Sequence, residues 1–138
     1  MIDGKNINIE QLNDFMSTSM SGYLEMEVIE VGDNFLKMKM PVSDKTRQPF
    51  GILDGGASMA LAETAASLAG NLMAEPDKRC VGLEINGNHI KAIKSGFVVA
   101  TASPIHLGKT TQIWQIVIHS DKDALVCMSR MTLAVIDK

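Results

Sequence analysis

One stretch near the middle of the chain limits its possible folds more than any other. Residues 55–74, GGASMALAETAASLAGNLMA, consist of small and apolar side chains and include a single charged residue, Glu63. The pattern predicts a helix of about 17 residues that starts at the glycine pair, reaches about Met73 and spans roughly 25 Å. Small residues occur on all sides of this helix, which predicts burial nearly all round. Polar residues interrupt the stretch, which argues against a membrane span.

Strand-like segments surround this helix in the sequence. Residues 24–28 and 36–40 alternate apolar with charged side chains, and Gly32-Asp33 between them predicts a hairpin turn. A short amphipathic helix, capped by Asn8, is expected before them. Four further strands are predicted after the long helix: Val81–Lys91, Phe97–Ile105, Thr111–Ser120 and Ala124–Ile136.

This order of elements predicts an α+β protein. Two strands, one long helix and four strands without intervening helices favour a mostly antiparallel sheet curled around the helix. The edges of such a sheet commonly join a partner chain. A length of 138 residues predicts one domain that covers the whole chain, residues 1–138.

Composition excludes several classes of function. The net charge of −3 argues against nucleic-acid binding, because no basic excess is present to neutralise phosphates. The two cysteines, Cys80 and Cys127, have neither a metal-binding nor a disulfide spacing, and we expect reduced thiols. The first residues lack the pattern of a signal peptide. We therefore expect a soluble, cytoplasmic domain that is not associated with a membrane.

Glu63 is the first candidate for chemistry. Burying an ionised carboxylate among apolar side chains lowers the stability of the fold by roughly several kcal/mol unless the charge is paired. Burial also raises the pKa of a carboxyl group, which prepares an acid or base for work near neutral pH. The alternative is a structural glutamate that bonds backbone amides or points into solvent.

The glycine pair before Glu63 predicts a site for a carbonyl oxygen. Unpaired amides at a helix N-terminus can stabilise charge that develops on such an oxygen, and Gly55 supplies one of them. Glu63 lies about 10–12 Å further along the axis. Ser67 shares the face of Glu63, and Gln48 lies in the preceding loop; either can bind a water molecule or a leaving group. Each of these residues also has an ordinary role as a cap or loop group.

Basic residues and histidines follow the helix. His89 is expected to share one strand face with Val81, Leu83 and Ile85 and to point toward the helix. Its spacing from His106 and His119 does not predict a metal site. Lysines and the run Gly108-Lys109-Thr110-Thr111 are reasonable contacts for a phosphate-bearing tail.

These motifs together resemble a known family. GILDGGASMALAETAASLAG, VGLEINGNHI and PIHLGKTTQIWQI resemble, in order, segments of the hotdog-fold acyl-CoA thioesterases, particularly the bacterial branch that acts on aromatic acyl-CoAs. The resemblance covers nearly the whole chain. It implies a sheet of five or six strands wrapped around the helix, and homodimers that pair into tetramers, with active sites between two subunits. It implies no metal and no cofactor, since coenzyme A is part of the substrate.

The resemblance also implies roles for individual residues. Glu63 is expected to act as the nucleophile or as the base that activates water, and the Gly55 N–H to polarise the thioester carbonyl. Gln48 and Ser67 match polar assistants, with Ser67 contributed by the partner subunit. Coenzyme A contacts are implied for Gly82, for His89, Ile90, Lys91 and Ala92, and for His106, Leu107, Gly108, Lys109, Thr110 and Thr111.

Asp54 departs from the family pattern, which has histidine before the glycine pair. Histidine can donate a hydrogen bond to the thioester oxygen, whereas an ionised aspartate only accepts. Asp54 is also a favourable helix N-cap. The departure leaves a non-catalytic acyl-CoA or aromatic-ligand binding protein as an alternative to the hydrolase. A hydratase or dehydratase of the same fold ranks last, because its loop motif is absent from the sequence.

Overall fold

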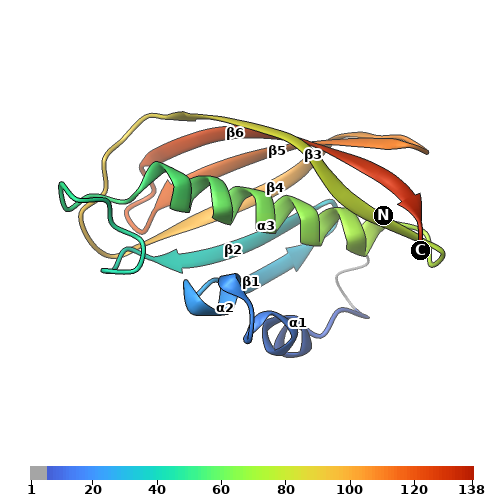
Figure 1. Cartoon of the computed structure of the whole chain (residues 1–138), viewed down its shortest axis with the longest axis horizontal. Helices are drawn as coiled ribbons and strands as arrows, with labels where there is room; N and C mark the ends of the chain where they lie inside the picture. The colour runs from blue at the N-terminus through green and yellow to red at the C-terminus, as the bar shows by residue number, and fades with distance from the viewer. Residues whose placement is uncertain (1–5) are drawn as a thin grey trace.

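A computed structural model describes residues 6–138 and shows a sheet curled around one long helix (Figure 1). The six strands are antiparallel and follow the order β1-β2-β4-β5-β6-β3. The elements, in chain order, are α1 (Ile9–Met16), α2 (Met20–Tyr23), β1 (Glu27–Gly32), β2 (Phe35–Pro41), α3 (Gly55–Met73), β3 (Lys78–His89), β4 (Phe97–Leu107), β5 (Thr111–Ser120) and β6 (Leu125–Asp137). The predicted α+β hotdog architecture is confirmed.

The helix α3 provides one side of the core, but the prediction that it is buried nearly all round is wrong. Its buried residues are those that face the sheet: Ser58, Leu61, Ala62, Ala65, Ala66, Ala69 and Gly70. Gly56, Glu63 and Asn71 form an exposed stripe on the opposite side. Small side chains therefore report how closely this helix approaches the sheet, and they do not report burial on every side. Glu63 is exposed in the single chain.

The first helix agrees with the prediction and the first strand does not. Asn8 caps α1, where its side chain accepts a hydrogen bond from the backbone N–H of Gln11. The predicted strand at residues 24–28 begins only at Glu27. Leu24 instead caps the short helix α2, and Glu25 has a positive φ of 59°. The end of α2 therefore includes Leu24, the first residue of the segment whose alternating apolar and charged side chains predicted a strand.

A β-bulge at Leu83 changes which side chains of β3 face the helix. The pairing of β3 with β6 shifts register between Gly82 and Glu84, which leaves Leu83 without an opposite residue. Leu83 is therefore 64% exposed, and Val81 is also exposed. The predicted common face of these residues with Ile85 and His89 is wrong, because a bulge reverses the alternation. His89 nevertheless faces the helix, as predicted.

The two outer strands of the sheet are each bonded by an asparagine from a helix. The Asn13 side chain accepts from the Val28 N–H at 2.8 Å and donates to its carbonyl at 3.1 Å. The Asn71 side chain accepts from the Cys80 N–H at 2.9 Å and donates to its carbonyl at 3.1 Å. Each amide thus occupies the free edge at one residue of an outer strand. Beyond Cys80, the outer edge of β3 lies open.

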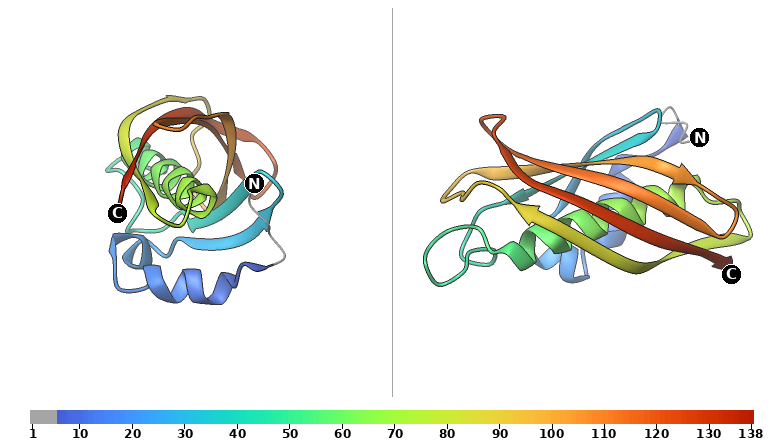
Figure 2. Two further views of the ribbon diagram at one scale, coloured as in Figure 1. Left: turned by 90° about the vertical axis from the view of Figure 1, so that its right-hand side faces the viewer. Right: turned by 90° about the horizontal axis from the view of Figure 1, so that it is seen from above.

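Figure 2 shows α1 beside β1, away from the open edge of β3.

Cys80 and Cys127 are free thiols in the core, and burial raises the pKa of both, so they stay protonated near neutral pH. Within residues 6–138, no helix combines the length and apolar character needed to cross a bilayer.

The Asn13 contact predicts a measurable loss of stability. Replacing Asn13 with Ala leaves the N–H and carbonyl of Val28 without their partner and should lower the free energy of unfolding by about 1–2 kcal/mol. Urea unfolding at one fixed protein concentration measures it. Gln11→Ala, on the exposed side of the same helix, is the control. Equal stability of the two variants would contradict a role for Asn13 at the strand edge.

Candidate active site

A cavity of about 280 Å³ opens at the N-terminal end of α3. Two chain segments and the first turn of the helix form its walls. Six residues predicted for the site line it, namely Gln48, Gly55, His89, Ile90, Lys91 and Ala92, and the remaining walls are Ile52, Leu53, Ser58 and Val126. The structure thus brings together four of the eleven predicted coenzyme A contacts and two of the predicted catalytic residues. The walls are mainly apolar, with a few polar groups, as in small-molecule sites.

The loop that carries Gln48 is a tight turn. The Gly51 N–H bonds the Gln48 carbonyl at 2.9 Å, Pro49 occupies the second position, and Gly51 has a φ of 81°, which favours glycine. The Gln48 side-chain oxygen accepts from the Phe50 N–H, and its amide NH₂ donates no hydrogen bond within the described residues. Gln48 can therefore donate a hydrogen bond into the cavity. Phe50, at the tip of the turn, is 90% exposed.

Gly55 is the first residue of α3, and its backbone faces the cavity. Its N–H donates no hydrogen bond within residues 6–138, as expected for the first turn of a helix. A Cβ atom at this position would lie 2.9 Å from the Nε2 atom of His89. The absence of a side chain thus lets the imidazole pack directly on the helix N-terminus. The amide and the imidazole open into the same cavity.

Asp54 caps α3. Its Oδ1 atom accepts from the Gly56 N–H at 2.6 Å, and its backbone is extended, as is usual for a cap. The carboxylate thus turns back toward the helix and does not line the cavity. The aspartate occupies one amide of the first turn and leaves that of Gly55 open. Its negative charge still lies close to any oxygen bound there.

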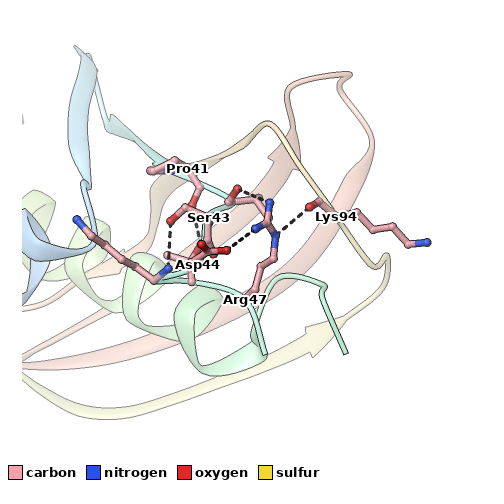
Figure 3. A network of polar contacts seen from close by, with 8 residues as sticks. Pro41, Ser43, Asp44, Arg47 and Lys94 are labelled. Carbon is pink, nitrogen blue, oxygen red and sulfur yellow. Dashed lines mark hydrogen bonds and ion pairs between the residues drawn. The ribbon is translucent and has the colours of Figure 1, made fainter. Parts of the chain in front are cut away.

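Arg47 joins the two segments that wall the cavity (Figure 3). Its guanidinium donates to the Lys94 carbonyl at 3.1 Å and the Val42 carbonyl at 3.4 Å, and it pairs with Asp44 at 2.9 Å. The Leu53 N–H bonds the Ile93 carbonyl at 2.7 Å beside this network. These bonds fix the distance between the loop of Gln48 and the segment that follows His89. Sequence reasoning did not identify Arg47, since its bond to the Lys94 carbonyl joins positions 47 residues apart in the sequence.

Glu63 lies outside this cavity. Its carboxylate packs against β3, where a Cβ atom on Gly82 would come within 3.1 Å of Oε1. Ser67 is one helical turn further along the same side and is half-buried. The structure therefore brings Glu63 and Gly82 together, but it separates them from Gly55 and Gln48. Within one chain, the predicted site consists of two halves.

The predicted contacts from His106 to Thr111 are even more distant from the cavity. They lie where β4 ends and β5 begins, while Phe97, at the start of β4, pairs with Pro41 near the cavity end of the sheet. Eleven strand residues extend about 35 Å, at about 3.3 Å each. One chain thus places the two groups of predicted coenzyme A contacts at opposite ends of the sheet.

Some cavity residues were not identified from the sequence. Ser58 follows Gly55 by one helical turn, and this spacing was a usable signal. Val126, from β6, reaches the cavity only through the strand order, which the sequence did not predict. Within the described part of the chain, no group of three His, Cys, Asp or Glu side chains is placed to hold a metal ion.

Comparison with known proteins identifies the family of this chain. The model of the thioesterase superfamily matches residues 50–127. A 1,4-dihydroxy-2-naphthoyl-CoA hydrolase from Escherichia coli is 43% identical over 136 residues, which are 99% of this chain and 100% of the relative. A proofreading thioesterase, EntH, from Cronobacter turicensis is 40% identical over 98% of both chains. The crystal structure of a thioesterase from Haemophilus influenzae superposes with a TM-score of 0.95 at 46% identity and covers 99% of this chain and 96% of its own.

The chain belongs to the thioesterase superfamily and has the hotdog fold of that family. It is a hydrolase of thioesters. The resemblance predicted from three sequence motifs is confirmed.

Two substitutions of Asp54 separate its effect as a helix cap from the effect of its negative charge. Asp54→Asn keeps the cap and removes the charge, so stability should stay within about 0.5 kcal/mol, while Asp54→Ala should lose about 1 kcal/mol. Turnover of Asp54→Asn should rise by up to about tenfold, because repulsion of the developing oxyanion is removed. Thermal unfolding and thiol release measure the two effects. Slower turnover of Asp54→Asn would show that the carboxylate assists the reaction.

Proposed function

We propose that the protein hydrolyses aromatic acyl-CoA thioesters to a free acid and coenzyme A in the cytoplasm. The observation that carries this proposal is the unpaired Gly55 amide, at the positive end of α3, which opens into a mainly apolar cavity. An aromatic ring fits walls formed by Ile52, Leu53 and Val126. The hydrolase from Escherichia coli, whose name specifies a naphthoyl thioester, supports this substrate class.

In the proposed reaction, the Gly55 N–H holds the thioester carbonyl oxygen. Attack on the carbonyl carbon moves charge onto this oxygen, where the amide and the helix dipole stabilise it. Glu63 either takes a proton from the attacking water or attacks the carbon itself and forms an anhydride that water then opens. The carbon–sulfur bond breaks, and the thiolate of coenzyme A leaves and takes up a proton.

Glu63 meets Gly55 only if two chains contribute to one site. We infer a homodimer in which the open edges of two β3 strands pair antiparallel. Asn71 closes this edge at Cys80, and β3 ends at His89, so the free segment is centred near Ile85. A two-fold axis at Asn86 pairs residues that share a sheet face, and the extra residue of the bulge at Leu83 then places Gly82 of one chain opposite His89 of its partner. Glu63 then approaches the partner's cavity.

The same dimer supports the proposed coenzyme A site. It brings the far end of one sheet toward the cavity end of the other, so that residues 106–111 of one chain approach residues 89–92 of its partner. Lys91 and Lys109 then provide positive charge for phosphates. Half-buried Val99, Val117 and Met128 on the outer sheet face support further pairing of dimers into a tetramer.

Thiol release from coenzyme A esters tests the reaction. Glu63→Gln should lower turnover of benzoyl-CoA by several orders of magnitude, because the amide neither attacks nor accepts a proton. The fold should be unchanged, since this side chain is exposed in the single chain. Glu10→Gln, at an exposed carboxylate on α1 away from the open edge of β3, is the matched control. Unchanged hydrolysis by Glu63→Gln would remove its catalytic role.

Mixing two inactive variants tests whether the site is shared. Gly55→Pro removes the amide but suits the first helical position, and the extended Asp54 backbone accepts a following proline. Gly55→Ala keeps the amide and is its control. After unfolding and refolding together, Gly55→Pro and Glu63→Ala should recover about a quarter of wild-type activity, since half of the dimers carry one intact site. No recovery, despite mixed dimers, would place both residues in one chain's site.

A further inference from the structure

His89 has a position that a contact with the coenzyme A tail does not explain. Its Nε2 atom lies 2.9 Å from the point where a Cβ on Gly55 would stand, so the ring packs on the residue whose amide is proposed to bind the thioester oxygen. The ring lines the same cavity and makes no hydrogen bond within the described residues. An imidazole donates from Nε2 both as the cation and as one neutral tautomer.

The distances allow two donors to reach one oxygen atom. The amide nitrogen of a residue lies about 2.5 Å from its Cβ position, so the Nε2 atom of His89 is at most about 5.4 Å from the Gly55 nitrogen. Donors up to about 5.8 Å apart can share an acceptor at about 2.9 Å from each.

We propose that the imidazole of His89 is a catalytic hydrogen-bond donor to the thioester carbonyl oxygen, beside the Gly55 N–H. This role rests on the proposed function. It supplies a second donor in a site where the nearest side chain before the helix, Asp54, can only accept. The imidazole stabilises the oxyanion as the carbonyl carbon becomes tetrahedral, and it forms or breaks no covalent bond. Removing one such donor typically costs about 10²–10³ in turnover.

Steady-state hydrolysis of benzoyl-CoA by the full chain tests this role. His89→Leu should lower kcat by about a hundredfold and change KM by less than about threefold, because the donor acts mainly on the transition state. His89→Gln retains a terminal N–H donor and should stay within about tenfold of the wild type. The control is His119→Leu, on the outer sheet face, with unchanged activity. A raised KM with unchanged kcat in His89→Leu would overturn the proposal and leave a binding contact.

The carbonyl stretch of bound benzoyl-CoA gives a second readout. In the Glu63→Gln background, where the ester persists, binding should shift this stretch to lower frequency, and adding His89→Leu should reverse part of the shift. An identical frequency with and without His89 would overturn the proposal. Wild-type protein that releases no thiol from benzoyl-CoA or other aromatic esters would overturn the proposed function itself. An active wild type with unimpaired His89→Leu would overturn only the role of His89.

Discussion

The close approach of α3 to the edge strand β3 determines the rest of the site. At three places along this contact a glycine stands where a side chain would collide: Gly55 against His89, Gly87 against Met59, and Gly82 against Met131 and Glu63. Each contact allows a functional or packing side chain to lie directly on the opposite backbone. A side chain at any of these glycines would displace the side chain that now lies against its backbone. The cavity and the position of the carboxylate both depend on this spacing.

Along the contact between α3 and β3, the groups proposed to act on the substrate lie in two separate places. The amide end of α3 and His89 lie at one end of β3, and Glu63 with Gly82 lies nearer the other. A helix cannot bring its own first turn and its third turn to one small atom, because the axial rise separates them. Two-fold symmetry resolves this, since it places unlike ends of an antiparallel pair together. The proposed sharing of one active site between two copies thus follows from the placement of both groups on one straight helix.

The sequence predicted the fold well and the exposure of its residues poorly. Alternation and turn residues were sufficient for the strands, and β5 was predicted at its observed bounds, Thr111–Ser120. The bulge at Leu83 was not visible, because an extra strand residue leaves no mark in composition. Burial of α3 nearly all round was predicted wrongly, since small and apolar residues in the sequence do not reveal which side of the helix the sheet covers. The Arg47 contacts join segments far apart in the sequence, and pattern reasoning does not detect such pairings.

The asparagines at the sheet margins have a consequence for assembly. Asn13 bonds one outer strand at Val28, and Asn71 bonds the other outer strand at Cys80. The remaining margin of β1 is short and has α1 beside it, whereas the margin of β3 stays open from Val81 to His89. A molecule with two such margins would polymerise into ribbons, as amyloid-forming strands do, but one with a single margin stops growing after the first association. The chain can thus retain an adhesive strand without forming fibrils.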